Sequence, residues 1–274
     1  MLSDTCLGEL TELANALADS AGAASLPYFR ARDLGTDDKG DGARARFDPV
    51  TAADRAAERA MRELLAARRP DDAVFGEEEA GKEGTSGLTW VLDPIDGTRA
   101  FISGLPLWGT LIALDDGSRG RIGLVDQPYI GERFVGVVGN ARVEAWMTGP
   151  AGRRPLSTRP CAGLEAATLF TTDPFLFDAA EAEAFRAVRA RARLTRYGTD
   201  CYAYALLALG LVDLVIEADL AAYDIAAHVP IIEAAGGRVT DWKGHCCRWG
   251  GRAVAAGSVE VHAAALEILS QVPD

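Results

Sequence analysis

The chain has 274 residues, of which 49% are apolar, enough for one large domain or two modest ones. Its formal net charge of −12 argues against a nucleic-acid partner, which selects a basic face, and against an anionic membrane surface. If an acidic chain of this kind binds a phosphate ester, a feature other than bulk charge must attract it.

The first predicted element is an amphipathic helix that Ser3 or Asp4 can cap and that reaches about residue 28 or 30. Its apolar residues recur at helical spacing: Leu7, Leu10, Leu13, Ala14 and Leu17. No cationic stretch precedes it, so we do not expect a signal peptide, and no apolar run approaches the ~18 residues of a membrane span.

A polar loop, a second helix and a short strand follow. Residues 33–49 are rich in Gly and Asp without periodicity, which is typical of a loop. Residues 50–70 carry an apolar face at helical spacing and end at Pro70. A short strand then ends at Gly76, and the acidic turn GEEE begins there.

Several strands in meander order complete the first half, which we place at residues 1–150. They are predicted at residues 88–94, 106–114, 119–126 and 132–147, the last range holding two strands around a Gly-Asn turn. We expect a mixed or antiparallel sheet flanked by the helix pair. The Pro/Gly/Arg-rich stretch 149–162 forms the boundary.

The second half, residues 151–274, alternates strands and helices, an α/β pattern. Strands are predicted at residues 167–172, 194–199, 212–218, 238–241 and 253–257. Helices are predicted at residues 181–192, 202–210, 223–237 and 261–272.

The motif DPIDGT at residues 93–98 places two aspartates after an apolar strand. We expect Asp93 to close that strand, because Pro94 cannot continue its ladder. If a helix begins after Gly97, its free N–H groups bind an anion such as phosphate. Two carboxylates beside an anion site point to a bridging hard cation, Mg²⁺ or Mn²⁺. The alternative is a plain turn in which Asp93 caps a helix.

Three further acidic positions lie near predicted element ends. Glu77 follows a strand and lies near Asp93 if the two strands are neighbours; alternatively the acidic triplet is a solvated turn. Asp54 lies early in the second helix, where capping alone explains it. Asp224 lies just before or at the start of an Ala-rich helix, at an N-cap position.

Together, GEE, DPIDGT and YDIAA…EAAGG, with DPVTAAD upstream, resemble the inositol-monophosphatase family of Mg²⁺-dependent phosphomonoesterases over essentially the whole chain. The stretches FDPVTAADRAAERAM and RYGTDCYAYALLALG are most similar to its bacterial histidinol-phosphatase branch. The resemblance implies an α/β (α+β) fold of the fructose-bisphosphatase/inositol-monophosphatase type, a layered αβαβα sandwich with the site between the halves. It also implies a homodimer.

The resemblance assigns roles to individual residues. The metal ligands it implies, for two or three Mg²⁺ ions that Mn²⁺ can replace, are the side chains of Glu77, Asp93, Asp96 and Asp224 and the carbonyl of Ile95. Asp54 matches the position that holds a third, weaker ion. Thr98 and Glu77 match the pair that orients or deprotonates the attacking water. Gly97 and Thr98 supply phosphate-facing N–H groups.

The alcohol portion of the substrate is implied to contact Gly198, Thr199, Asp200 and Glu217. Asp200 can pair with an ammonium group, which histidinol phosphate has and inositol phosphate lacks; the alternatives are a helix cap for Asp200 and a solvated strand end for Glu217. We predict a histidinol-phosphatase of histidine biosynthesis. The alternatives are an inositol or sugar phosphatase and a non-catalytic, metal-linked sensor or scaffold.

Other residues are interpreted as structural. Trp108 either walls the pocket or belongs to the core, and His228 is expected to pack rather than to bind metal. The five cysteines have no regular spacing, and the vicinal Cys246 and Cys247 cannot form an ordinary disulfide without strain. Reduced thiols in the cytoplasm fit best, and the alternative is a soft-metal site with His245.

Overall fold

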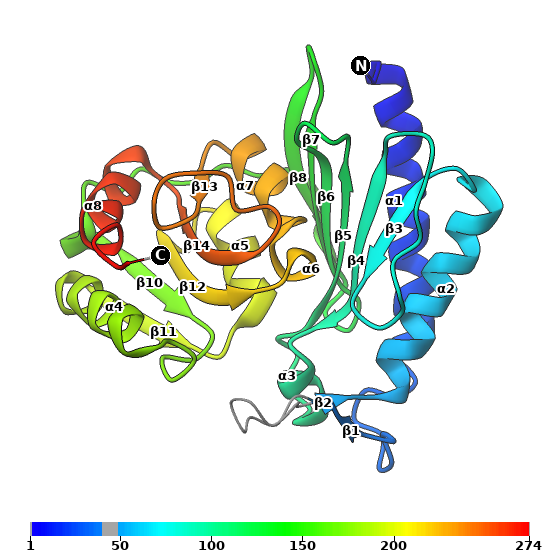
Figure 1. Cartoon of the computed structure of the whole chain (residues 1–274), viewed down its shortest axis with the longest axis horizontal. Helices are drawn as coiled ribbons and strands as arrows, with labels where there is room; N and C mark the ends of the chain where they lie inside the picture. Colours follow the sequence, from blue (N-terminus) through cyan, green and yellow to red (C-terminus); the bar gives the residue numbers. More distant parts are fainter. Residues whose placement is uncertain (1, 40–48, 274) are drawn as a thin grey trace.

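Two β-sheets and three groups of helices stack as alternating layers in the computed structural model, which describes residues 2–39 and 49–273 (Figure 1). From one side to the other, the layers are α1 (Asp4–Ser25) with α2 (Ala52–Arg68), a seven-stranded sheet, α5 (Asp200–Ala208) with α6 (Ala222–Ile225) and α7 (His228–Ala234), a five-stranded sheet, and α4 (Ala179–Arg191) with α8 (Val259–Leu269). This order confirms the predicted αβαβα sandwich. No helix in the described ranges is long and apolar enough to cross a membrane.

The seven-stranded sheet is a meander with one parallel strand at its edge. In spatial order, its strands are β3 (Ala73–Gly76), β4 (Thr89–Asp96), β5 (Gly109–Asp115), β6 (Gly120–Gln127), β7 (Glu132–Val138), β8 (Val143–Gly149) and β9 (Gly152–Pro155). Neighbours from β4 to β9 are antiparallel, and β3 lies parallel to β4. The last strand, β9, lies in the stretch that the sequence suggested to be a loose boundary.

The five-stranded sheet has the crossovers expected of the α/β pattern. Its spatial order is β11 (Leu194–Tyr197), β10 (Thr168–Thr171), β12 (Leu214–Leu220), β14 (Gly251–Ala256) and β13 (Arg238–Thr240). Strand β10 is parallel to both neighbours, whereas β14 is antiparallel to both of its own. A 3₁₀ turn, η1 (Leu164–Ala166), precedes β10.

The N-terminal elements agree with the sequence in type and differ at their ends. Helix α1 begins after Ser3, whose hydroxyl accepts the N–H of Cys6, but it ends at Ser25, before residue 28. The predicted polar loop contains a two-residue strand pair, β1 (Asp37–Asp38) and β2 (Pro49–Val50). Residues 40–48 of that loop lie outside the described residues.

The helix predicted over residues 223–237 is two helices, α6 and α7. The break has a local cause. Pro230 has no N–H to donate to the carbonyl of Ala226, and its ring crowds that carbonyl, so one continuous helix cannot pass through both residues. Pro230 instead lies in the first turn of α7, where the missing N–H costs little.

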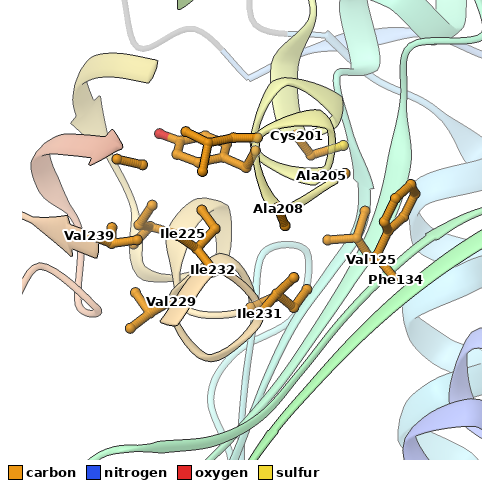
Figure 2. Packing of buried hydrophobic residues seen from close by; sticks show 14 of the residues in the cluster. Val125, Phe134, Cys201, Ala205, Ala208, Ile225, Val229, Ile231, Ile232 and Val239 are labelled. Atoms are coloured by element: carbon orange, nitrogen blue, oxygen red, sulfur yellow. The ribbon is translucent and has the colours of Figure 1, made fainter. Parts of the chain in front are cut away.

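Helix α7 packs directly on the seven-stranded sheet because two facing glycines leave it room. Gly123 of β6 and Gly136 of β7 are cross-strand partners. A Cβ atom on Gly136 would lie 2.6 Å from the backbone nitrogen of Ile231, and one on Gly123 would lie 2.7 Å from Pro230. Figure 2 shows Ile231 of α7 and Ala205 and Ala208 of α5 facing Val125 and Phe134 of the sheet in this central apolar cluster.

We expect Gly136→Ala to destabilise the protein by about 2–3 kcal/mol, because the methyl group collides with the backbone of α7, which cannot move away without opening the core. Urea unfolding measures the loss. Gly120→Ala in the neighbouring strand β6 is the matched control, since its Cβ would meet Pro230 at an ordinary 3.4 Å. Equal stabilities for the two variants would contradict the close packing.

Candidate active site

Strand β4 carries both aspartates of the DPIDGT motif on one face because it contains a bulge. The strand does not stop at Asp93 as predicted but continues to Asp96. Asp93 pairs with Leu111 and Asp96 pairs with Gly109, so two residues of β4 lie opposite the single residue Thr110. Side chains three apart in a regular strand point to opposite faces, and the extra residue removes this difference. The hydroxyl of Thr110 donates to the carbonyl of Pro94 at 2.9 Å.

The third aspartate comes from the other half of the chain. One carboxylate oxygen from each of Asp93, Asp96 and Asp224 lies within 4.8 Å of the other two. Asp224 is the third residue of α6 and accepts the N–H of Ala221 at 2.7 Å, so it is not the predicted N-cap residue. Asp96 accepts the N–H of Cys201, in the first turn of α5, at 2.7 Å.

The three carboxylates destabilise one another when all are ionised. Burial, then Glu77, Asp96 and Asp224, raise the pKa of Asp93 well above its ordinary value. Burial, together with Asp224, raises the pKa of Asp96 to about 7. Buried anions this close are compensated by a cation, and an all-oxygen donor set is what Mg²⁺ and Mn²⁺ prefer. The residues present therefore fit a hard divalent metal ion.

Glu77 adjoins this cluster from the neighbouring strand. Because β3 is parallel to β4 with Gly76 opposite Leu92, Glu77 follows at the level of Asp93. Burial raises the pKa of Glu77 to about 7, although Lys39 opposes the shift. The ammonium of Lys39 lies 3.1 Å from Glu77 and also pairs with Glu78. Glu77 is thus not the solvated turn residue of the alternative interpretation.

Thr98 connects two other predicted residues. Its hydroxyl donates to the carbonyl of Ile95 at 3.0 Å and lies 3.5 Å from Asp54. Asp54 itself accepts the N–H of Thr51 at 2.8 Å in the capping box of α2, so its capping role is present as well. Gly97 has a φ of 81° and is the N-cap residue of α3 (Thr98–Ile102), the helix start that the motif predicted.

These residues surround a cavity of about 170 Å³ between the two halves. Its lining comprises Glu77, Asp93, Ile95, Asp96, Gly97, Thr98, Arg99, Thr172, Asp200 and Asp224. Arg99 and Thr172 were missed by the sequence reasoning. Arg99 is the residue after DPIDGT, so its position was a usable signal; Thr172 ends a strand of the other half without any motif.

The residues predicted to contact the alcohol portion are placed unequally. Asp200 lines the cavity, has a positive φ of 41°, and has its pKa raised to about 7 by burial and by Asp96. Gly198, with a φ of 73°, donates to the carbonyl of Thr172 at 2.8 Å. The Thr199 hydroxyl is buried and finds no hydrogen-bond partner within the described residues.

Glu217 lies behind the cavity wall rather than at a solvated strand end. It is 3% exposed and accepts the N–H and hydroxyl of Thr172 at 2.6 and 3.0 Å, and the hydroxyl of Thr171 at 3.1 Å. Burial raises the pKa of Glu217 to about 8. Its link to the cavity passes through Thr172.

The residues interpreted as structural do not belong to the cluster of three aspartates. Trp108 packs in an aromatic cluster with Phe29 and Phe101. The ring of His228 stacks on Tyr204 with 4.3 Å between centroids, and it is not part of the carboxylate cluster. All five cysteines are free thiols.

The carboxylate cluster lies between the halves of an αβαβα fold and forms a candidate site for a divalent cation. The profile of the inositol monophosphatase family matches residues 7–273. The chain is 43% identical to the bifunctional phosphatase IMPL2, chloroplastic, of Arabidopsis thaliana over 98% of this chain and 77% of that protein. It is 36% identical to a histidinol-phosphatase of Mycobacterium tuberculosis over 89% and 91% of the two chains.

Among solved structures, an inositol monophosphatase from Zymomonas mobilis has a TM-score of 0.82 and 42% identity, covering 96% of this chain and 98% of that one. The chain belongs to the inositol monophosphatase family. The predicted resemblance is confirmed, and the histidinol-phosphatases among the relatives support the predicted branch.

We expect His228→Phe to weaken the dependence of stability on acid. Burial lowers the pKa of His228 from 6.5 to about 3, so between these values the unfolded chain binds a proton that the folded chain does not. The contribution of neutral His228 to the free energy of unfolding is complete above pH 6.5. It decreases as the pH falls, by about 2 kcal/mol at pH 5.

Urea unfolding at pH 7.5 and pH 5 tests this expectation. Phenylalanine keeps a ring on Tyr204 and has no titrating nitrogen, while His262, whose pKa burial also lowers, is present in both proteins. Parallel losses of stability in wild type and variant would show that His228 does not cause the acid dependence.

Proposed function

We propose that this protein hydrolyses phosphate monoesters with Mg²⁺ and that its substrate is L-histidinol phosphate. The observation that carries the proposal is the convergence of Asp93, Asp96 and Asp224, from two halves of the chain, within 4.8 Å. All the carboxylates of the predicted set are present, which disfavours a non-catalytic sensor or scaffold. Homodimer formation and a cytoplasmic location stay predictions.

The cluster and its neighbours hold the cations. Asp93, Asp96, Asp224, Glu77 and the carbonyl of Ile95 are the proposed ligands for two or three Mg²⁺ ions, which Mn²⁺ can replace, and Asp54 serves the weakest site. When bound, Mg²⁺ neutralises the phosphoryl oxygens and the leaving alkoxide and acidifies water. A chain of net charge −12 thereby attracts a phosphate.

The hydroxyl of Thr98 and the carboxylate of Glu77 orient the attacking water, and Glu77 accepts its proton. The water oxygen forms a bond to phosphorus while the bond from phosphorus to the ester oxygen breaks. The ester oxygen takes up a proton from solvent water and leaves as an alcohol, and Glu77 returns its proton to the solvent. The N–H groups of Gly97 and Thr98 face the phosphate. Such a transfer depends mainly on alignment and charge neutralisation, so no covalent nucleophile is needed.

Asp200 is the proposed contact for the substrate's ammonium group. Asp200 lines the cavity beside the proposed phosphate site. A Cβ atom added to Gly97 would lie 3.2 Å from the Cβ atom of Asp200. Gly198 and Thr199 directly precede Asp200 in the chain and are proposed to contact the alcohol portion with it, and Glu217 supports the wall through Thr172. The 36% identity to a histidinol-phosphatase supports the choice, whereas the 42% identity to an inositol monophosphatase favours inositol phosphate as the second candidate.

The test is a comparison of kcat/KM for histidinol phosphate, inositol monophosphate and fructose bisphosphate, followed by phosphate release with Mg²⁺ and with chelator. We expect histidinol phosphate to be preferred by about tenfold or more.

Asp93→Asn should lower turnover by about a thousandfold because a cation ligand is lost. Higher kcat/KM for inositol monophosphate would replace the proposed substrate, and full activity in chelator would reject the metal site.

We expect Asp200→Asn to lower kcat/KM for histidinol phosphate about 30-fold and to change hydrolysis of an amine-free ester, such as p-nitrophenyl phosphate, much less. The variant keeps the shape of the side chain and removes the charge that pairs with ammonium. Equal losses on both esters would assign Asp200 to general site structure instead.

A further inference from the structure

A buried carboxylate outside the predicted site holds the turn that carries Glu77. Glu58 lies in α2 and is 0% exposed. Its Oε2 accepts the N–H of Glu78 at 2.7 Å, and its Oε1 accepts the N–H of Glu79 at 3.1 Å. The two peptide groups that follow Glu77 are therefore fixed by one side chain from another element.

Arg62, one turn later in α2, completes this arrangement. Its Nε donates to Glu58 at 2.7 Å, and its Nη2 donates to the carbonyl of Glu79 at 2.9 Å. Arg62 thus neutralises the buried carboxylate and holds the far end of the same turn. A buried charge is tolerated when it is paired and its lone pairs are occupied, and both conditions are met here.

Gly76 makes the close approach possible. A Cβ at this position would lie 2.6 Å from the carboxyl carbon of Glu58 and 2.8 Å from Nη2 of Arg62. The glycine is needed for space, because its φ lies outside the left-handed range. The GEEE turn at residues 76–79 therefore combines the space that Gly76 leaves for Glu58 with the two N–H groups that donate to the Glu58 carboxylate.

We propose that Glu58 is a positioning residue that aims Glu77 at Asp93 and at the cation bound there. This inference rests on the proposed metal site. The direction of the Glu77 side chain depends on the peptide planes around it, and Glu58 fixes the plane on its C-terminal side. Strand pairing of Gly76 with Leu92 fixes the other side.

The test measures Mn²⁺ binding to the substrate-free protein by electron paramagnetic resonance titration. Glu58→Gln keeps the shape of the side chain but replaces one carboxylate oxygen with an NH₂ group. One of the two N–H groups of the turn, that of Glu78 or that of Glu79, then loses its acceptor. We expect Mn²⁺ affinity to fall about tenfold, a typical cost for losing a partner that orients a metal ligand. The midpoint of Mg²⁺ activation should rise in parallel.

Two variants separate positioning from general stability. Asp72→Asn removes a buried carboxylate at the opposite end of β3, where it accepts bonds from Arg69 and Trp90. It should lower the melting temperature and leave Mn²⁺ affinity unchanged. Glu63→Gln changes an exposed glutamate of α2 and should alter neither quantity.

The outcomes are distinguishable. If wild type binds no Mn²⁺, the metal site of the proposed function is rejected. If wild type binds and Glu58→Gln binds equally well, only the role of Glu58 is rejected. If Glu58→Gln does not fold, Arg62→Gln provides the test, because it frees the carbonyl of Glu79 and loosens Glu58; unchanged Mn²⁺ affinity in that variant overturns the inference.

Discussion

The repulsion among buried carboxylates is the constraint on which the site depends. The carboxylates of three aspartates lie within 4.8 Å and repel one another when they are ionised. Because burial keeps water from screening these charges, the pKa values of Asp93 and Asp96 are raised. Rigid elements around these carboxylates are needed to hold them together while no cation is bound. The bulge of β4 and the first turns of α5 and α6 provide these elements, each through backbone bonds to the carboxylates or their strand.

The two halves meet closely enough to share the cluster because glycine replaces side chains at their seam. Gly123 and Gly136 let α7 lie against the seven-stranded sheet, and α6, which carries Asp224, directly precedes α7 and contacts β4. The apolar cluster of Figure 2 covers the rest of this seam. A larger residue at either glycine would therefore affect both the packing and the distance from Asp224 to Asp93.

Periodicity and motif content predict most of the elements and the cluster, because meander strands, alternating α/β units and DPIDGT are local signals. The bulge was not predictable, since it depends on which residue of β5 faces Asp93. The break between α6 and α7 had a local signal in Pro230, but the Ala-rich pattern favoured one continuous helix. Glu58 looks like one more polar residue of an amphipathic helix, because its partners are N–H groups 20 and 21 positions later.

Asp200 joins the electrostatics of the site to its proposed selectivity. A non-glycine residue with a φ of 41° is strained, and such strain persists where surrounding structure imposes it, often at functional sites. The first turn of α5 imposes it here, since the next residue, Cys201, donates its N–H to Asp96. Asp200 is therefore held beside a cluster that already repels it. A cation from the substrate relieves this repulsion, whereas a neutral hydroxyl does not, and this difference is the physical basis of the selectivity that we propose for an amine-bearing ester.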